Sequence, residues 1–256
     1  MYSKLSGHND WQNKIVWVTG ANQGIGAETA KQFQQLGAKV IGFDREFSLP
    51  NHKITQVVLD ISDEIAITDT CKSLLKYYGR VDILVNIAGV LEMGDIMDLT
   101  TEQWTSSFNV NVSGAFHLMR QVIPQMKLNK EGVIVNISSN ATHMPRMSMG
   151  AYSASKAALT NLTLVAGIEL AKYGIRCNVI SPGSTQTPMQ WSLWNDSQGE
   201  EQTINGFPEQ FKPGIPLGKL ATPEDIADTV IFLCSPNASH ITLQDIVIDG
   251  GATLGK

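Results

Sequence analysis

Hydrophobic and polar positions follow two distinct periods along this chain. Continuous apolar runs predict buried strands, and longer segments with apolar residues at helical spacing predict amphipathic helices between them. The apolar runs predict strands at residues 15–19, 39–43, 56–59, 83–85, 133–137, 176–180 and 245–248. The helical segments are expected at residues 24–36, 62–78, 101–126, 152–171 and 223–234. Strands and helices therefore alternate along almost the whole chain.

Such alternation is typical of βαβ units, whose crossovers place helices on both faces of a parallel sheet. We predict an α/β fold, a single doubly wound three-layer domain over residues 1–256 with a mostly parallel seven-stranded sheet. No linker, low-complexity block or internal repeat indicates a domain boundary. Polar residues at helix starts predict N-caps at Ser62 and Thr101, and Pro223 stands at a first helical position.

Residues 187–213 depart from this alternation and form a long insertion before the last helix. The insertion carries several large side chains: Met189, Gln190, Trp191, Leu193, Trp194, Phe207 and Phe211. Aromatic residues in a polar insertion are typical of a lid or a binding loop. A pair of surface helices packed by the same aromatics fits the pattern equally well. We expect a lid-like insertion, with the helix pair as the alternative.

Composition narrows the class of protein. The 256 residues are 43% hydrophobic and 17% charged, as in an ordinary globular protein. A net charge of −5 provides no basic surface for nucleic acid or an acidic membrane. No apolar run approaches the ~18 residues of a membrane span, and Met1 to Asp10 lack the apolar core of a signal peptide. A cytoplasmic protein is expected, with no nucleic-acid or membrane partner.

The cysteines predict neither a metal site nor a disulfide framework. Cys71, Cys177 and Cys234 stand far apart, and no Cys-x-x-Cys pair occurs. Buried free thiols in a reducing compartment are the simplest interpretation. We expect no bound metal.

A glycine-rich turn joins the first predicted strand to the first predicted helix. Its sequence is Gly20-Ala-Asn22-Gln23-Gly24-Ile25-Gly26, with the spacing Gly-x-x-x-Gly-x-Gly. Glycines there permit a tight turn and a close approach of backbone to phosphate, and the helix N-terminus offers free N–H groups. A strand, a glycine-rich turn and a helix in this order predict a pyrophosphate site for a dinucleotide.

An acidic residue ends the second predicted strand. Asp44 can accept hydrogen bonds from both hydroxyls of an adenosine ribose, and its charge would repel a 2′-phosphate. This predicts NAD rather than NADP, with a solvated loop acid as the alternative. Arg45 follows directly and complicates the prediction, because an arginine at this place can serve NADP.

Small and polar residues follow two further strands. The turn Asn86-Ile87-Ala88-Gly89 lets a dinucleotide pass close to the backbone, although a plain strand-end turn has the same composition. The loop Ser181-Pro182-Gly183-Ser184-Thr185 offers hydroxyls that can meet the amide of a cofactor. Both turns lie at strand ends, where open α/β sheets bind ligands.

One stretch before the fourth helix holds the candidate reaction centre. Tyr152 and Lys156 are four residues apart, so a helix places them on one face. Ser139 follows the strand 133–137 and therefore lies at the ligand-binding edge of the sheet. An ammonium beside a phenol favours the phenolate and lowers its pKa, which suits proton exchange with an alcohol. Alone, Tyr-x-x-x-Lys is more often an ordinary helix face, but the dinucleotide features favour chemistry.

Asn111 is a polar residue within an otherwise apolar helical stretch. A buried asparagine needs hydrogen-bond partners. Asn111 either satisfies nearby backbone groups or holds a water in the site, and the pattern leaves both open.

Together these motifs resemble the short-chain dehydrogenase/reductase family, from residue 13 to the end. The matching elements are Thr19–Gly26, Asp60, Asn86–Gly89, Asn111, Ser139, Tyr152, Lys156, Pro182 and Gly183, whereas Ile87 stands where many members carry Asn or Ala. The resemblance implies a Rossmann-like fold and a catalytic tetrad of Asn111, Ser139, Tyr152 and Lys156. It also implies cofactor contacts from Gly20, Asn22, Gln23, Gly24, Ile25, Gly26, Asp44, Asp60, Ile61, Asn86, Ala88, Gly89, Tyr152, Lys156, Pro182, Gly183, Thr185 and Thr187.

Longer stretches resemble a narrower group of the family that serves catecholate siderophore biosynthesis. They are residues 141–146, 182–190, 206–219 and 238–255. This resemblance implies NAD-dependent oxidation of 2,3-dihydro-2,3-dihydroxybenzoate by a cytoplasmic homotetramer. One alternative is a reductase that acts on a carrier-linked ketoacyl chain with NADPH, which Asp44 disfavours. Another is a non-enzymatic NAD(H) sensor, which has no need of Tyr152 and Lys156.

Such a substrate carries a fixed carboxylate, and a dry site needs a cation to receive it. Arg146 is the best candidate because it lies between Ser139 and Tyr152 in the sequence. The alternative is a solvated loop residue or a contact between subunits. The expected substrate contacts are Ser139, Arg146, Tyr152, Met189, Gln190 and Trp194.

Overall fold

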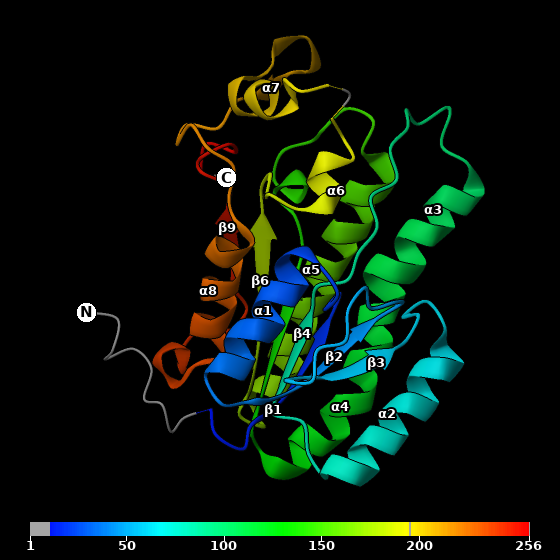
Figure 1. Ribbon diagram of the computed structural model, residues 1–256, viewed down its shortest axis with the longest axis vertical. Helices are drawn as coiled ribbons and strands as arrows, with labels where there is room; N and C mark the ends of the chain where they lie inside the picture. Colours follow the sequence, from blue (N-terminus) through cyan, green and yellow to red (C-terminus); the bar gives the residue numbers. More distant parts are fainter. Residues whose placement is uncertain (1–10, 195, 256) are drawn as a thin grey trace.

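The computed structural model describes residues 11–194 and 196–255 (Figure 1), so the expectation for Met1 to Asp10 lies outside the described residues. The main strands are β1 (Ile15–Thr19), β2 (Lys39–Asp44), β3 (Thr55–Val58), β4 (Ile83–Asn86), β5 (Gly132–Ile137), β6 (Ile175–Pro182) and β9 (Asp245–Ile248). The α-helices are α1 (Gly24–Gln35), α2 (Glu64–Tyr78), α3 (Thr101–Phe108), α4 (Ala115–Asn129), α5 (Gly150–Ala171), α6 (Pro188–Trp191), α7 (Gly199–Asn205) and α8 (Pro223–Cys234).

The seven strands form one sheet in the order β3-β2-β1-β4-β5-β6-β9. Every neighbouring pair in this sheet is parallel, so the sheet is wholly rather than mostly parallel. The strand order reverses between β1 and β4, where Val18 pairs with Gly42 on one side and Val85 on the other. Crevices at such reversals bind ligands beyond the carboxyl ends of the strands. The predicted fold class is confirmed.

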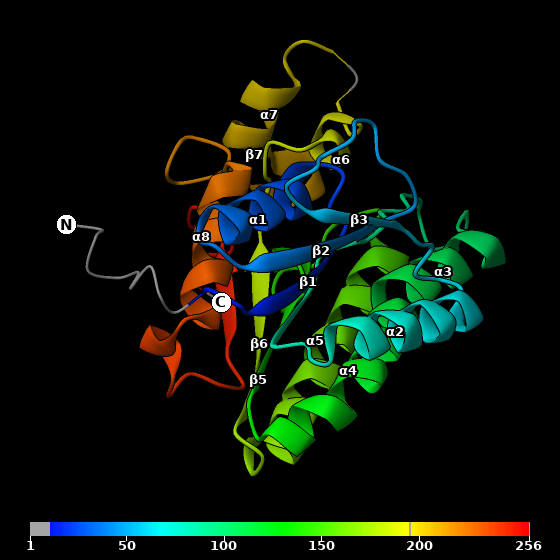
Figure 2. The ribbon, with the colours of Figure 1, turned by 60° about the horizontal axis from the view of Figure 1, so that its bottom comes forward.

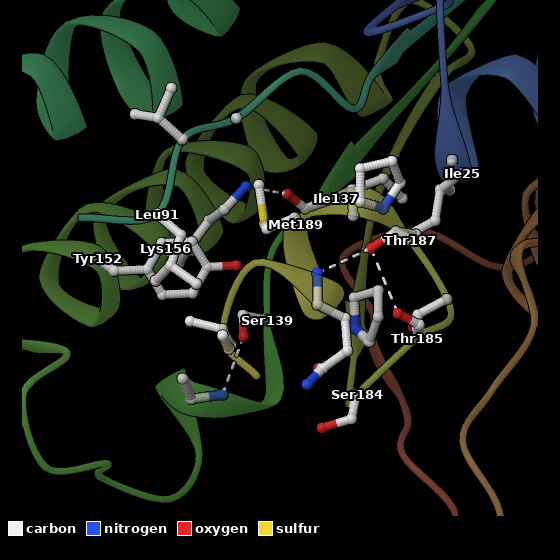
Figure 3. Close-up of a pocket in the computed structure, with 18 of the residues that line it drawn as sticks. Ile25, Leu91, Ile137, Ser139, Tyr152, Lys156, Ser184, Thr185, Thr187 and Met189 are labelled. Atoms are coloured by element: carbon white, nitrogen blue, oxygen red, sulfur yellow. Dashed lines mark hydrogen bonds between the residues drawn. The ribbon is translucent and has the colours of Figure 1, made fainter. Parts of the chain in front are cut away.

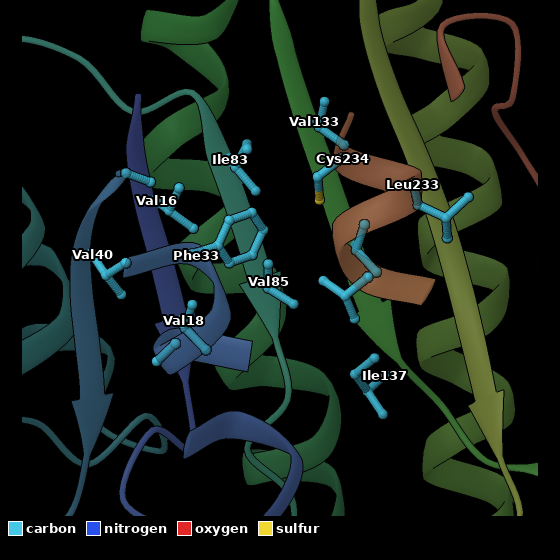
Figure 4. Close-up of a cluster of buried hydrophobic side chains, with 14 of the residues drawn as sticks. Val16, Val18, Phe33, Val40, Ile83, Val85, Val133, Ile137, Leu233 and Cys234 are labelled. Carbon is cyan, nitrogen blue, oxygen red and sulfur yellow. The ribbon is translucent and has the colours of Figure 1, made fainter. Parts of the chain in front are cut away.

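Successive side chains of a strand point to opposite faces of the sheet and pack into two separate hydrophobic cores. Val16 and Val18 of β1 pack with Phe33 of α1 and Leu233 of α8 on one face of the sheet (Figure 4). Trp17, between them in sequence, packs into the opposite core with residues of α2, α4 and α5. The two ribbon views agree that α1 and α8 share one side of the sheet (Figures 1 and 2). This arrangement is the predicted three-layer architecture, and it explains why the strands read as continuous apolar runs.

The segment predicted as one helix over residues 101–126 has a different structure. A π-helical segment, Asn109–Gly114, separates α3 from α4. Gly114 lies tightly against the turn between β3 and α2, since an added Cβ would come within 2.6 Å of the Ile61 carbonyl oxygen. The wider turn carries Asn111, which is 1% exposed. π-turns inside helices are frequent at functional sites, and apolar spacing alone does not reveal them.

Two predicted helix starts were wrong by one residue. The N-cap of α2 is Asp63 rather than Ser62, because the Asp63 carboxylate accepts a hydrogen bond from a backbone N–H of the first turn. The Ser62 hydroxyl instead donates to Asp60 at 2.7 Å. The N-cap of α3 is Thr100 rather than Thr101, and it closes a capping box with the glutamine three residues later.

The insertion over residues 187–213 contains both helices and a small hairpin. α6 and α7 are followed by β7 (Gly206–Phe207) and β8 (Lys212–Pro213), which pair antiparallel. Trp194 packs on a small cluster formed by Ile215, Leu220 and Ala252. Figure 1 shows α7 beyond the carboxyl end of β6, on the side of the sheet where its strands end. The insertion therefore contains the helices and the packed aromatic of the second alternative, and the lid-like role stays a prediction.

Candidate active site

A cavity of about 500 Å³ lies where the carboxyl ends of the parallel strands meet the insertion. Most of the predicted site residues line it: Gly20, Gln23, Gly24, Ile25, Gly26, Asp44, Asp60, Ile61, Ala88, Gly89, Ser139, Arg146, Tyr152, Lys156, Pro182, Gly183, Thr185, Thr187, Met189, Gln190 and Trp194. These residues come from segments far apart in the sequence. The strand topology therefore gathers the dinucleotide motifs and the candidate reaction centre around one space.

Three predicted site residues do not line the cavity. Asn22 binds the following loop, where its side chain accepts from the backbone N–H of Ser48 at 2.9 Å. Asn86 is 4% exposed and donates to Asn136 across the sheet at 2.8 Å, so it is a buried strand-end residue rather than part of the cavity wall. Asn111 lies behind the wall in the π-turn.

Tyr152 and Lys156 project side by side from α5 towards the cavity, with Ser139 on the facing segment (Figure 3). The Lys156 Nζ lies 5.9 Å from the centre of the Tyr152 ring and donates a hydrogen bond to the Ile137 carbonyl oxygen at 2.8 Å. That carbonyl ends β5, so the sheet fixes the position of the ammonium. Ser139 precedes a short 3₁₀ turn, and its hydroxyl accepts from the backbone N–H of Ala141 at 3.2 Å.

Burial governs the ionisation of the two central groups. Burial lowers the pKa of Lys156 to about 8, which leaves the amine mostly protonated at neutral pH. Burial raises the pKa of Tyr152, and a hydrogen bond with Ser139 opposes this effect. The expectation that the neighbouring ammonium leaves Tyr152 with a lowered pKa is therefore wrong for the protein's own residues. The free energy needed to remove a phenolate from water exceeds the stabilisation that the neighbouring groups provide.

Asn111 satisfies the backbone that follows the β4 turn. Its Oδ1 accepts from the Val90 N–H at 2.8 Å, and its Nδ2 donates to the Val90 carbonyl at 3.0 Å and the Ser155 hydroxyl at 2.9 Å. Of the two open interpretations, this geometry supports the binding of backbone groups. Gly89 packs just in front, where an added Cβ would lie 3.0 Å from Asn111 Oδ1 and 3.2 Å from Lys156 Nζ. Asn111 thus holds one wall of the site close to the lysine.

The glycine-rich turn forms a close-packed cradle. Gly20 has a φ of 69°, in the left-handed region that glycine adopts without strain. A Cβ on Gly26 would lie 2.0 Å from the Gly20 carbonyl oxygen, so no larger residue fits at position 26. The turn ends at the N-terminus of α1, where Gln23 is the N-cap and makes no side-chain capping bond. The first N–H groups of this helix therefore remain available to an anion.

Asp44 ends β2 inside the cavity. Its Oδ2 accepts from the Asn22 N–H at 2.9 Å, and its Oδ1 accepts from the Arg45 N–H at 2.8 Å. Both bonds hold the carboxylate against the cavity wall without removing its charge. Such a carboxylate suits the ribose hydroxyls of a dinucleotide and opposes a phosphate at the same place. These features fit a nicotinamide dinucleotide.

Several residues at the substrate end of the cavity were not predicted from the sequence. They are Gln202, Thr203, Gln210 and Lys212, all from the insertion. Phe207 also lines the cavity and was predicted only as one of the large side chains of the insertion. The insertion has no regular period, so its pattern does not tell which side chains face inward. A cation within a stretch rich in aromatics was the available signal for Lys212.

The described residues contain no candidate metal cluster. No group of three His, Cys, Asp or Glu side chains among residues 11–194 and 196–255 is arranged to hold an ion. Cys71, Cys177 and Cys234 are buried free thiols as predicted, and burial raises the pKa of each to about 12. Within the same ranges, no helix is both long enough and apolar enough to cross a membrane.

Comparison with known proteins extends over nearly the whole chain. The protein family described as "Enoyl-(Acyl carrier protein) reductase" matches residues 20–253. The chain is 52% identical to the 2,3-dihydro-2,3-dihydroxybenzoate dehydrogenase of Escherichia coli (strain K12), over 96% of this chain and 99% of that protein. It is 45% identical to the protein of the same name from Bacillus subtilis (strain 168), over 95% of this chain and 97% of that one.

Solved structures share the fold. A short-chain dehydrogenase/reductase family protein has a TM-score of 0.84 at 31% identity, over 96% of this chain and 99% of that one. The 3-ketoacyl-(acyl-carrier-protein) reductase from Brucella melitensis, complexed with NADH, has a TM-score of 0.83 at 31% identity, over 95% of this chain and 99% of that chain.

Proposed function

The chain belongs to the short-chain dehydrogenase/reductase family, and from this premise we propose that it oxidises 2,3-dihydro-2,3-dihydroxybenzoate to 2,3-dihydroxybenzoate with NAD⁺. One observation carries the proposal. Tyr152, Lys156 and Ser139 line the same cavity as Arg146, whose Nη1 is buried without a hydrogen-bond partner among the described residues. A hydroxyl-processing centre thus lies in one cavity with a cation that is free to receive a carboxylate.

Membership of the family implies an NAD(P) cofactor, and we propose NAD as the form used. The cradle of Gly20 and Gly26 would hold the pyrophosphate at the N-terminus of α1. Asp44 would accept the ribose hydroxyls, and its fixed charge opposes a 2′-phosphate. Bound NAD⁺ supplies the hydride acceptor, and its positively charged ring favours the phenolate of Tyr152.

The protein's own residues accept the proton and hold the reacting oxygen in position. Tyr152 takes the proton of the reacting ring hydroxyl while the carbon that carries this hydroxyl loses its hydride. Ser139 donates a hydrogen bond to the same oxygen and fixes its position. Lys156, held by the Ile137 carbonyl, keeps a positive charge near the phenolate. Loss of hydride and proton leaves a ketone, whose tautomer is a catechol, so aromatisation draws the reaction forward.

Asn111 is assigned a positioning role in this scheme. Its bonds to Val90 hold the segment after β4 against the π-turn. Through Gly89 this segment lies beside Lys156, so Asn111 sets the wall that the reacting groups face. Arg146 receives the substrate carboxylate, and Met189, Gln190 and Trp194 of the insertion cover the ring.

We further propose that the enzyme serves siderophore biosynthesis as a cytoplasmic homotetramer. The two relatives of the same name, at 52% and 45% identity over nearly full length, support the assignment of the reaction. Several large apolar side chains on helices remain exposed in the single chain, including Val165 and Ile168 on α5. Such a helix face supports association with other copies of this chain.

The deciding experiment is NADH formation by the purified protein with 2,3-dihydro-2,3-dihydroxybenzoate, with the product identified as 2,3-dihydroxybenzoate. A 3-ketoacyl thioester with NADPH is the matched competitor, since the reductase from Brucella melitensis shares the fold. We expect turnover of the diol carboxylate with NAD⁺. Efficient reduction of the thioester with no oxidation of the diol would replace this proposal by the ketoacyl reductase.

A further inference from the structure

Two basic side chains face the substrate end of the cavity from different parts of the chain. Arg146 lies on the loop between β5 and α5, and Lys212 lies on β8, in the hairpin of the insertion. Among residues 11–194 and 196–255, neither forms an ion pair with a carboxylate. Arg146 Nη1 is fully buried and has no hydrogen-bond partner in this part of the chain. Two cations without a matched acid are costly unless a ligand supplies the charge.

The two charges influence each other. Burial lowers the pKa of Lys212, and the charge of Arg146 lowers it further. Burial also lowers the pKa of Arg146, while the charge of Asp249 raises it. Asp249 accepts from Asn140 Nδ2 at 3.2 Å and from the Gly251 N–H at 2.9 Å, which hold its carboxylate just after β9. Its charge acts on Arg146, but the two side chains form no ion pair among the described residues, so the guanidinium keeps donors for a ligand.

An aromatic ring supports Lys212 without neutralising it. The Lys212 Nζ lies 5.1 Å from the centre of the Phe207 ring, across the β7–β8 hairpin. A cation–π contact stabilises the ammonium through the face of the ring. An ammonium has three N–H donors, and among the described residues the Lys212 Nζ forms no ion pair, so it keeps donors for an anion. Phe207 lines the same cavity and supplies an apolar surface beside the charge.

We propose that Lys212 and Arg146 form a two-sided carboxylate site, in which the substrate anion joins the insertion hairpin to the loop before α5. The planar guanidinium takes the two carboxylate oxygens side by side, and the ammonium binds a remaining lone pair as a point charge. The ligand class is a small cyclic or aromatic carboxylate, whose ring packs near Phe207. This assignment of Lys212 rests on the proposed function for the identity of the natural ligand.

Binding of the reaction product tests the site without turnover. Titration calorimetry compares 2,3-dihydroxybenzoate with catechol, which lacks the carboxylate, on wild type, Lys212→Met and Lys219→Met. Lys219 is an exposed lysine on the same segment that does not line the cavity, so it is the matched control. We expect Lys212→Met to lower the affinity for 2,3-dihydroxybenzoate roughly ten- to 150-fold, the scale of a charged hydrogen bond. The affinity of Lys212→Met for catechol, and the affinity of Lys219→Met for both ligands, should stay within about twofold of wild type.

Two further measurements separate ligand binding from folding. Lys212→Met removes an unpaired, partly buried charge, so its melting temperature without ligand should equal or exceed that of wild type. The rise in melting temperature on adding 2,3-dihydroxybenzoate should shrink. Lys212→Arg should restore most of the affinity. If both cations hold one carboxylate, the combined loss in Lys212→Met with Arg146→Leu will be smaller than the product of the separate losses.

Two results would overturn the two-sided site. One is unchanged affinity of Lys212→Met for 2,3-dihydroxybenzoate, and the other is an equal loss for catechol. The proposed function fails separately, through absence of NADH formation from the diol carboxylate. A protein without that turnover but with carboxylate-selective loss in Lys212→Met would keep the anion site and change only its natural ligand.

Discussion

The two halves of the cavity are built on opposite electrostatic principles. In the cofactor half, polar groups are paired within the protein: the Thr19 hydroxyl accepts from the Ile87 and Ala88 N–H groups, and Asp44 accepts from two backbone N–H groups. In the substrate half, Arg146 and Lys212 form no ion pair with a carboxylate among the described residues. In the cofactor half, only backbone N–H groups at the start of α1 await an anion, whereas in the substrate half two side-chain cations do.

This difference has a structural origin. The cofactor half consists of turns that leave β1, β2 and β4, whose positions the sheet hydrogen bonds fix. The substrate half consists of the loop before α5 and the insertion over residues 187–213. Loops carried by a rigid scaffold can vary in sequence without disturbing the core. In this chain the cofactor half is thus built on strand ends, and the substrate half on loops.

The largest effect is expected where the two halves meet. Tyr152→Phe keeps the ring and removes the oxygen that accepts the proton. Turnover should fall by at least ~10²-fold, the scale of general-base catalysis. The measurement is the initial rate of NADH formation at saturating diol carboxylate. NAD⁺ affinity, measured by titration, should stay near that of wild type, and near-normal turnover would reject the assigned base.

Arg146→Leu separates the substrate half from the cofactor half. We expect KM for 2,3-dihydro-2,3-dihydroxybenzoate to rise roughly ten- to 150-fold, because a charged hydrogen bond is lost. KM for NAD⁺ and kcat/KM for an uncharged cyclic alcohol should change little. An equal effect on the charged and uncharged substrates would show that Arg146 does not bind the carboxylate, and the anion would then need backbone N–H groups.

The pH dependence of stability tests the burial of Lys156. Its pKa is about 8 in the folded protein and 10.5 when unperturbed. Between these values the unfolded chain binds more protons, so the contribution of Lys156 to stability rises with pH across this window. The unfolding free energy of wild type minus that of Lys156→Met should increase by about 3 kcal/mol from pH 7 to pH 10.5. Urea unfolding measures it, and the alkaline effects of the buried cysteines cancel in the difference. A flat difference would mean that Lys156 is not desolvated.

The smallest effect concerns the choice of cofactor. Asp44→Ala removes the charge that opposes a 2′-phosphate, so the preference of kcat/KM for NAD⁺ over NADP⁺ should fall by about tenfold. Arg45→Ala is the matched control, since Arg45 also lines the cavity. Equal use of both cofactors by wild type would show that Arg45 rather than Asp44 governs this end of the cavity.

Most residues predicted for the cofactor half line the cavity, because the features of this half leave local signals, although Asn22 and Asn86 do not line it. Apolar runs placed the strands to within about two residues, and the glycine spacing from Gly20 to Gly26 marks a turn where no larger residue fits at position 26. The proximity of Tyr152 and Lys156 could also be predicted, since helical spacing alone puts their side chains on one face. These signals depend on residues close together in the chain.

The substrate half left weaker signals because its contacts join distant segments. Lys212 shares the cavity with Arg146 only through the path of the insertion, which has no regular period. The π-turn that positions Asn111 is shaped by close packing of Gly114 against Ile61, and apolar spacing over residues 101–126 resembles a continuous helix. The raised pKa of Tyr152 likewise depends on burial, which the Tyr-x-x-x-Lys spacing does not report.

The central claim is that an anion completes the substrate half, and one comparison on the unmodified protein tests it most directly. It is the ratio of kcat/KM for 2,3-dihydro-2,3-dihydroxybenzoate to that for the same cyclohexadiene diol without its carboxylate, at saturating NAD⁺. With Arg146 and Lys212 unpaired among the described residues, we predict a preference for the carboxylate of at least ~10-fold. Equal kcat/KM values for the two diols would contradict the account.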